Sequence, residues 1–491
     1  MIYKTDMKRL QPLDRTAISL MAILFILIAL LLLTGDRTVP QVRDFNWNNQ
    51  QVGVENTAFT LEFNRTMDWD QVEENLKITP PLNGKISWSG RRLAYTLTDP
   101  MPYGTEFQVQ LANIAEASRG SRHQSKAMKP FAGEFRSRDR AFVYIGVNGE
   151  EAGRLILQNL TQGDKTILTP ENLVVVAYRM YPLGDRILFA ANDRKIHEQQ
   201  DFNPQLYTVT TGLQVDAPDL PSTPAVDPGK TKLVLDNEQY QILKFELSQD
   251  GERLIVQRAI RQGEGLGSVS LWQLVDGSLK SLEGVTGGDF LIAPDSNTLV
   301  IAQGQGIALL PLDNQQTAKP LGFLPQFGVV LSFAQDGTAA TMLKFNTDYS
   351  RSLFLVTNQG VQKELLNTKG SILRTAFGPQ KQSLYCLLTQ VQSEADAVEA
   401  PNLATIDGEE YVEIPYLAKI DLASGRLTKL LNLLPQDQTN ISLAPDGLAL
   451  LFDQVNTEGV QESSTLKILP LDAEISAPSL VAAGINPGWL P

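Results

Sequence analysis

The most marked feature of the hydrophobic pattern is one long uncharged run near the N-terminus. Residues Thr16 to Gly35 carry no charge, and Leu20 to Leu33 are apolar throughout. A helix of twenty residues covers about 30 Å, which is one hydrocarbon core. The competing interpretation is a cleaved secretory signal, whose apolar region is shorter and ends at a small-x-small site. No such site follows Leu33, so the pattern favours an uncleaved transmembrane helix over 16–35.

The residues that flank this run predict its orientation. Lys4, Lys8, Arg9 and Arg15 precede it, and basic residues next to a span tend to stay in the cytoplasm. We therefore expect a single-pass membrane protein with residues 1–15 as a cytoplasmic tail. Everything after the span is expected in the periplasm or outside the cell.

Residues 38–138 show the alternation of apolar and polar positions that is typical of half-buried strands. Four stretches follow it: Phe59–Phe63, Lys85–Trp88, Arg92–Leu97 and Glu106–Leu111. Turn signals such as Asn-Gly and Ser-Gly separate them. About a hundred residues of short strands with this punctuation predict a β-sandwich.

Several motifs of this segment resemble the bacterial Ig-like domains of surface-layer and envelope proteins. They are Phe63-Asn-Arg-Thr-Met-Asp68, Ile78-Thr-Pro80, Trp88-Ser-Gly90 and Tyr103-Gly-Thr-Glu-Phe107. The resemblance implies a spacer or adhesion module. Asp68 and Asp70 suit either the N-terminus of a short helix predicted from Trp69 to Leu76 or oxygen ligands of Ca²⁺, and the helix cap is the favoured interpretation.

From residue 140 onward a repeat appears, in which a tight polar turn lies between two apolar strands. Successive turns start 66, 45, 41, 44 and 66 residues apart, and the short spacings match one four-stranded propeller blade. The turns are Pro182-Leu-Gly-Asp185, Ser248-Gln-Asp-Gly251, Ala293-Pro-Asp-Ser296, Ala334-Gln-Asp-Gly337, Gly378-Pro-Gln-Lys381 and Ala444-Pro-Asp-Gly447.

These turns resemble those of TolB-like and WD-repeat-like β-propellers, in which Pro-Asp-Gly turns join the two inner strands of a blade. The resemblance covers residues 140–491. Residues 141–168 supply three strands without an innermost partner, and Ile485 to Pro491 looks like one innermost strand with nothing after it. Joined, they make a seventh blade closed by one strand and three, which removes exposed sheet edges. Six or eight blades remain open alternatives.

The fold class predicted for the whole chain is therefore all-β. It comprises an Ig-like β-sandwich and a seven-bladed β-propeller with 1+3 strand closure, preceded by one transmembrane helix.

Two insertions, Asn192–Pro204 and Gln390–Glu413, follow the second strand of their blades, so we expect them on one propeller face. Loops on a rigid scaffold commonly carry binding residues. The second insertion is acidic, with no Lys or Arg from Gln382 to Ala418. A solvated loop, a docking surface for a basic partner and a divalent-cation site are all compatible with this pattern. The candidate binding residues are Glu394, Asp396, Glu399, Asp407, Glu409, Glu410 and Glu413.

Composition narrows the chemistry. The chain has 491 residues, one Cys and two His, which argues against a disulfide framework, multi-His metal sites and His-based triads. Its net charge of -13 comes from the propeller segment and argues against nucleic-acid binding. No catalytic motif is present, so we expect no enzyme activity, no cofactor and no metal. Cys386 lies in an apolar run and is expected in the core.

These observations favour a membrane-anchored, extracytoplasmic binding or scaffold protein, with the propeller as a platform for another envelope protein. The alternative is an enzyme that acts on cell-wall material or polysaccharide, or a sugar-binding protein, working through the propeller channel. Aromatic platforms would distinguish the two, and the propeller segment holds only Trp272 and Trp489.

Overall fold

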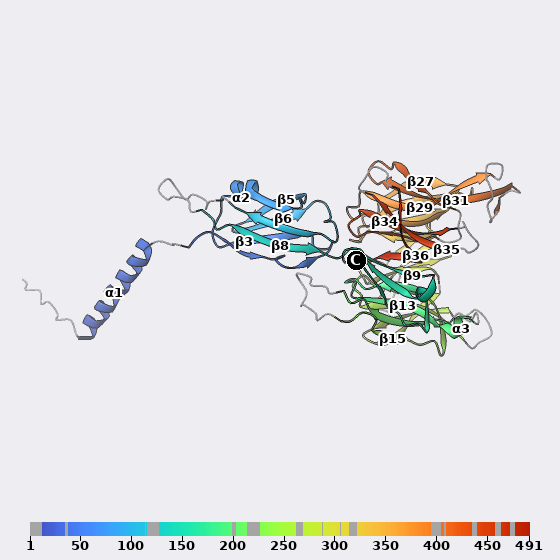
Figure 1. Ribbon diagram of the computed structural model, residues 1–491, viewed down its shortest axis with the longest axis horizontal. Helices are drawn as coiled ribbons and strands as arrows, with labels where there is room; N and C mark the ends of the chain where they lie inside the picture. Colours follow the sequence, from blue (N-terminus) through green and yellow to red (C-terminus); the bar gives the residue numbers. More distant parts are fainter. Residues whose placement is uncertain are drawn as a thin grey trace, which may run out of the picture.

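The structure is a computed structural model of an all-β protein (Figure 1). A β-sandwich is followed by a propeller, in which successive antiparallel sheets surround a centre. The described residues are 12–34, 38–112, 114, 127–198, 203–213, 226–261, 269–286, 288–304, 306–313, 322–393, 404–406, 409–434, 439–456, 463–471 and 477–491.

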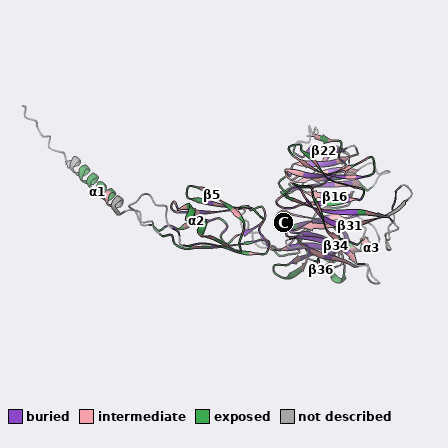
Figure 2. Ribbon diagram, turned by 90° about the horizontal axis from the view of Figure 1, so that it is seen from above, coloured by how far each residue is buried: buried purple, intermediate pink, exposed green. Residues whose placement is uncertain are grey.

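Helix α1 (Pro12–Thr34) precedes the β-structure. It begins four residues before the predicted span, at a proline that suits a first helical turn. Its side chains are described over residues 16–29, where large apolar ones such as Leu20 and Phe25 are exposed (Figure 2). Within the described residues no helix is both long and apolar enough to cross a membrane. The span over 16–35 stays a prediction.

Two four-stranded sheets form the sandwich. The first is β1 (Val42–Phe45), β3 (Ala58–Phe63), β6 (Arg92–Leu97) and β5 (Gly84–Ser89). The second is β2 (Gln51–Val52), β8 (Phe131–Ser137), β7 (Glu106–Leu111) and β4 (Leu76–Thr79). Their facing side chains, among them Trp47, Phe59, Phe107 and Phe135, make one core. Some of these aromatic rings meet edge to face and others stack. Their burial and their ring geometry both stabilise the packing of the two sheets.

The four predicted sandwich strands are confirmed to within one residue at each end. Four others were missed, because β2 has only two residues and β1 carries a register shift between Val42 and Asp44. Strand β4 starts directly after helix α2 (Trp69–Asn75), and β8 contains Gly133. The helix itself was predicted, and the Asp68 carboxylate caps it by accepting a hydrogen bond from the Gln71 N–H at 3.3 Å.

The propeller consists of successive antiparallel runs of strands. The runs are β9 (Ala141–Gly146), β10 (Leu155–Asn159), β11 (Asp164–Ile167); β12 (Leu173–Met180), β13 (Arg186–Asp193), β14 (Gln205–Thr210), β15 (Thr231–Leu235); β16 (Tyr240–Leu247), β17 (Arg253–Ile260), β18 (Val269–Val275), β19 (Ser278–Thr286); and β20 (Phe290–Ile292), β21 (Thr298–Gln303), β22 (Gly306–Pro311), β23 (Gly322–Leu324). The later runs are β24 (Val329–Phe333), β25 (Ala339–Phe345), β26 (Arg351–Thr357), β27 (Gln362–Thr368); β28 (Ile372–Phe377), β29 (Ser383–Ser393), β30 (Ala404–Ile406), β31 (Glu409–Asp421), β32 (Leu427–Asn432); and β33 (Ile441–Leu443), β34 (Ala449–Asn456), β35 (Ser463–Pro470), β36 (Ser479–Trp489). Two short helices, η1 (Gly149–Glu151) and α3 (Arg194–Glu198), lie between strands.

The six predicted turns share one geometry. In each, the N–H of the fourth residue donates to the carbonyl of the first at 2.8–2.9 Å, and the fourth residue has a positive φ. Glycine adopts that conformation without strain, which explains why four of the turns have Gly at this position. In the other two turns Ser296 and Lys381 adopt it, with φ of 57° and 55°. The first turn starts at Tyr181, one residue earlier than predicted, because Tyr181 is the residue that accepts from Gly184.

The C-terminal strand closes the propeller as predicted. The first part of β36 pairs with β35, and after a register shift between Ile485 and Gly488 its last part pairs with β9. One seven-stranded sheet, β11-β10-β9-β36-β35-β34-β33, results. Trp489 pairs opposite Phe142 in this ladder, and their rings meet edge to face with centroids 5.5 Å apart.

The first strands of the runs face the centre of the ring. β12 contacts β16, β16 contacts β20, β24 contacts β28, β28 contacts β33, and β33 contacts β36, while β24 also packs on β21 and β22. The Tyr178 hydroxyl on β12 lies 2.7 Å from the Asn486 carbonyl oxygen on β36, which joins the two ends of this series. Separate apolar clusters fill the spaces between neighbouring sheets, so each sheet is covered on both faces.

We predict that Trp489→Ala lowers the free energy of unfolding by about 3–5 kcal/mol, because it leaves a cavity at the closing strand. Trp489 is only 6% exposed, and its backbone N–H, which the substitution retains, donates to the Ser442 hydroxyl at 3.0 Å. Denaturant unfolding measures the change. Trp489→Phe, which keeps a ring against Phe142, should cost less, and an unchanged unfolding curve for the alanine variant would show that the strand contributes nothing to closure.

A second prediction concerns acid stability. Burial raises the pKa of the Asp336 carboxyl, but hydrogen bonds from Lys381 and Thr338 outweigh burial and lower the pKa from 3.8 to about 2. Because the folded-state pKa is depressed, this carboxylate stabilises the protein above pH 3.8, and the contribution is lost as the pH falls toward about 2. The difference in Tm between the native chain and Asp336→Asn should therefore shrink over that window. A difference that stays constant contradicts this assignment.

Candidate functional site

The sandwich docks on the propeller face that carries the predicted turns (Figure 1). The Asp446 carboxylate, from the last of those turns, accepts the Tyr103 N–H at 3.1 Å and an Arg140 guanidinium N–H at 2.7 Å. Its side chain is fully buried at this junction. Gln380, from the neighbouring turn, donates to the Thr98 carbonyl at 2.9 Å. Two adjacent turns thus hold one end of the sandwich.

Close backbone approach tightens the same junction. Gly104 has φ of 73°, and a Cβ added there would lie 2.5 Å from the Thr161 hydroxyl of the propeller. A side chain at this position would push the two domains apart, which explains a glycine in the Tyr103-Gly104 turn.

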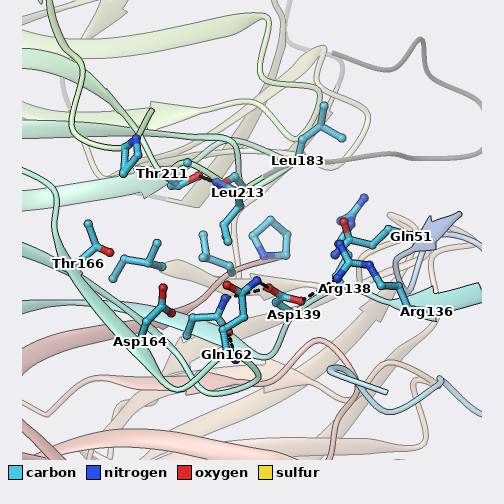
Figure 3. Close-up of a pocket in the computed structure, with 17 residues that line it drawn as sticks. Gln51, Arg136, Arg138, Asp139, Gln162, Asp164, Thr166, Leu183, Thr211 and Leu213 are labelled. Atoms are coloured by element: carbon cyan, nitrogen blue, oxygen red, sulfur yellow. Dashed lines mark hydrogen bonds and ion pairs between the residues drawn. The ribbon is translucent and has the colours of Figure 1, made fainter. Parts of the chain in front are cut away.

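A cavity of about 300 Å³ lies beside this junction, with walls from both domains (Figure 3). We call it the junction pocket. Its sandwich and linker wall is Gln51, Arg136, Arg138 and Asp139. Its propeller wall is Leu157, Asn159, Gln162, Asp164, Thr166, Leu183, Gly184, Thr211, Gly212, Leu213, Pro228, Leu490 and Pro491.

Most polar groups of the pocket already have partners. The Asp139 carboxylate accepts from Asn159 at 2.8 Å and from Gln162 at 2.7 Å. The Thr211 hydroxyl donates to the Gly184 carbonyl at 2.7 Å. Arg138 forms an ion pair with Glu55. These bonds fix the walls, so the pocket is preformed.

Two atoms of the sandwich wall are exceptions. The Gln51 Oε1 acceptor and the Arg138 Nε donor are buried and have no hydrogen-bond partner within the described residues. Gln51 is 7% exposed and Arg138 is 6% exposed. A buried polar atom without a partner costs about 1–3 kcal/mol. Nothing in the local sequence around these two residues signalled this pair.

The opposite propeller face carries both predicted insertions. Helix α3 follows β13, and strands β29 and β31 extend as a long hairpin, both on the side away from the sandwich (Figures 1 and 2). We call this the distal face. The second insertion is shorter than predicted, because β29 and β31 stay paired as far as Ser393 and Tyr411. Strand β30 pairs back onto β31.

The acidic candidates fall into three groups. Glu394, Asp396, Glu399 and Asp407 lie outside the described residues. Glu409 and Glu410 begin β31, where their backbones pair with β30. Glu413 accepts from the Thr389 hydroxyl at 2.6 Å and lies 3.9 Å from the Arg351 guanidinium, so its carboxylate has partners within the described residues, and its binding role stays a prediction.

The centre of the ring shows a feature that the sequence analysis missed. Strands β12, β16 and β28 carry a β-bulge at the same position, and the bulged residues Val176, Leu243 and Leu373 are exposed. Neighbouring sheets cover both faces of each sheet. We therefore infer that these three side chains are exposed along the edges of the first strands, which border the centre of the ring. Bulges commonly re-aim side chains next to functional sites.

Charged side chains follow these bulges. Arg179 pairs with Glu246 of the next first strand at 2.7 Å, and Lys244 pairs with Asp289. Arg374 has no ion pair or hydrogen bond within the described residues, and burial together with the charge of Arg179 lowers the pKa of its guanidinium. Three cationic side chains, Arg179, Lys244 and Arg374, therefore follow the exposed aliphatic ones on these strands, and the first two are in ion pairs.

Two features of the described residues bear on metal and thiol chemistry. Among them, no three His, Cys, Asp or Glu side chains cluster as metal ligands. Cys386 is buried in an apolar cluster, as expected, and burial raises the pKa of its thiol far above the ordinary value. A protonated thiol in that position is a core residue rather than a nucleophile.

We predict that Asp446→Ala loosens the junction, because it leaves the Tyr103 N–H and Arg140 without an acceptor. Spin labels at Arg92→Cys and Lys230→Cys report the distance between the domains, since the native Cys386 is buried. The distance distribution should broaden. Asp250→Ala is the control, because Asp250 accepts a similar turn hydrogen bond from Glu252 without touching the sandwich. Equal broadening in both variants contradicts the role of Asp446.

The sequence matches no protein-family model and no curated protein. Among solved structures, TolB from Acinetobacter baumannii is 12% identical, with 84% of this chain and 82% of that chain covered and a TM-score of 0.40. An oligogalacturonate lyase in complex with manganese is 12% identical, with 66% and 84% covered and a TM-score of 0.47. Hydrazine synthase from Kuenenia stuttgartiensis is 13% identical, with 63% and 85% covered and a TM-score of 0.38. The propeller assignment rests on the strand order and registers of the chain itself.

Proposed function

We propose that this chain is a membrane-anchored, extracytoplasmic binding protein that holds a partner protein on the distal face of its propeller. The observation that carries the proposal is the position of the sandwich. It occupies the turn face through Asp446 and Gln380, and it leaves the face with the long hairpin open.

The proposed organisation of the chain has four parts. Residues 1–15 form a cytoplasmic tail, 16–35 a transmembrane helix, 38–138 an Ig-like stalk and 140–491 the propeller. Seven blades with 1+3 closure are part of the proposal, which is supported by the pairing of β36 both with β35 and with β9. The stalk then lifts the distal face away from the bilayer, toward other proteins of the envelope.

Exposed apolar side chains on the distal face support protein binding. Phe345 ends β25 and is 58% exposed, and Tyr349 in the following loop is 77% exposed with φ of 62°. Ile260 and Leu434, at strand ends on the same face, are also exposed. Aromatic side chains of this kind are common anchors of protein interfaces. A strained backbone holding an exposed Tyr is typical of binding sites.

The alternative, a sugar-binding protein or an enzyme that acts on polysaccharide, needs an open aromatic platform. Trp489 is buried at the closing strand. Trp272 and Tyr240 both contact the Arg258 guanidinium, which lies 4.4 Å and 4.2 Å from the centres of their rings. One propeller tryptophan is therefore buried, and one face of the other is occupied by an arginine.

We predict that two distal-face variants weaken recovery of the partner in a pull-down from envelope extract. One replaces Tyr349 and Phe345 by Ser, which removes the apolar anchors. The other replaces Glu394, Asp396, Glu399, Glu409 and Glu410 by Gln or Asn. If the partner is basic, salt should reduce its recovery by the native chain, because the Debye length is only about 8 Å at physiological ionic strength.

The matched control lies on the turn face. Glu252→Gln and Asp227→Asn remove exposed carboxylates there and should leave recovery and Tm unchanged. Full recovery of the same partners by both distal-face variants would overturn the proposed docking face.

We predict that the intact chain fractionates with membranes and that protease added to spheroplasts removes residues after the span. A chain lacking residues 1–37 should be recovered in the soluble fraction. A mature N-terminus near residue 36 would show that the segment is cleaved, and protection from protease would reverse the proposed orientation.

A further inference from the structure

The junction pocket lies on the sandwich side of the propeller, away from the distal face, and the proposed partner docking does not use it. Its walls carry opposite charges. Arg136 projects from the sandwich wall and is half-exposed, while Asp164 lies on the facing propeller wall (Figure 3). Arg136 is only loosely paired, with its guanidinium 3.9 Å from Asp139. The Asp164 carboxylate has no hydrogen bond or ion pair within the described part of the chain.

The four charged lining residues, Arg136, Arg138, Asp139 and Asp164, sum to no net charge. Arg138 forms an ion pair with Glu55, and the Asp139 carboxylate accepts hydrogen bonds from Asn159 and Gln162. The two groups that remain available are one cation and one anion on opposite walls. A ligand with a single charge would satisfy one wall and leave the other unpaired, whereas a zwitterion satisfies both.

Hydrogen bonding on the sandwich wall points to the same kind of molecule. The partnerless Arg138 Nε is a donor and the partnerless Gln51 Oε1 is an acceptor. Both atoms belong to residues that line the pocket. An amide group supplies the complement, since its carbonyl accepts and its N–H donates.

The rest of the pocket is aliphatic. Leu157, Leu183, Leu213 and Leu490 line it together with two prolines, and no aromatic side chain is among its lining residues. Aliphatic walls bury aliphatic side chains well but give a sugar ring no surface on which to stack. The volume of about 300 Å³ is at the small end of ligand sites.

We propose that the junction pocket binds a short zwitterionic peptide with aliphatic side chains. Its carboxylate lies toward Arg136, its ammonium toward Asp164, and its amide between Gln51 and Arg138. Because the two walls belong to different domains, bound peptide stabilises the docked arrangement of sandwich and propeller.

The dipeptide L-leucyl-L-leucine tests this with the full chain in detergent, by isothermal titration calorimetry. Two matched probes remove one charge each: N-acetyl-leucyl-leucine lacks the ammonium, and leucyl-leucine amide lacks the carboxylate. The native chain should bind the zwitterion saturably with one site and bind each derivative roughly tenfold more weakly. It should also melt at a higher temperature when the zwitterion is present.

Two variants then assign the walls. Arg136→Gln should weaken the zwitterion roughly tenfold and remove the preference over the amide, while keeping the preference over the acetylated peptide. Asp164→Asn should do the reverse. Both side chains are exposed enough for the variants to fold, and Arg92→Gln and Asp250→Asn control for general charge effects. Absence of saturable heat with the zwitterion, equal binding of all three probes, or variants that behave like the native chain would each overturn the proposal.

Discussion

One strand, β36, belongs to two runs of strands at once, and the arrangement of the propeller depends on it. Its change of partner occurs at Asn486, where the backbone turns to φ of 51°. The Asp453 carboxylate accepts hydrogen bonds from the backbone N–H groups of Asn486, at 2.8 Å, and Asn440, at 2.6 Å. Burial raises the pKa of Asp453 although these hydrogen bonds oppose it. Closing the ring here also places the last turn, with Asp446, under the sandwich.

The sequence predicted those elements whose geometry is set by neighbouring residues. The six turns were recognised because each needs small, polar or glycine residues within four positions, and the closing strand because three strands lacked a partner. Strands β1, β2, β4 and β8 were missed, since they are short, bulged or interrupted and depend on their partners for pairing. The sequence analysis took the insertion after β29 as a loop, because this stretch is rich in polar residues. Cross-strand pairing, which the sequence does not show, extends β29 and β31 into it.

The candidate sites were less predictable for the same reason. Gln51, Arg136 and Asp164 are far apart in sequence and meet only after the domains dock. The bulges at Val176, Leu243 and Leu373 look like ordinary strand residues in the chain. Charge density, by contrast, is visible in the sequence, and it made Glu413 a candidate docking residue. In the structure that carboxylate accepts a hydrogen bond from the Thr389 hydroxyl.

The pairing of β9 with β36 also bears on biogenesis. Phe142 and Trp489 stand at opposite ends of the propeller segment, so their contact has a very high sequence separation and forms late. During synthesis, β9 would wait with an open edge, flanked by apolar residues, until its partner emerges. The sandwich, complete well before that moment, lies against the first run of strands, since Gly104 packs on Thr161 between β10 and β11. A sandwich that folds first thus gives the first propeller strands a neighbour to pack on before β36 is made.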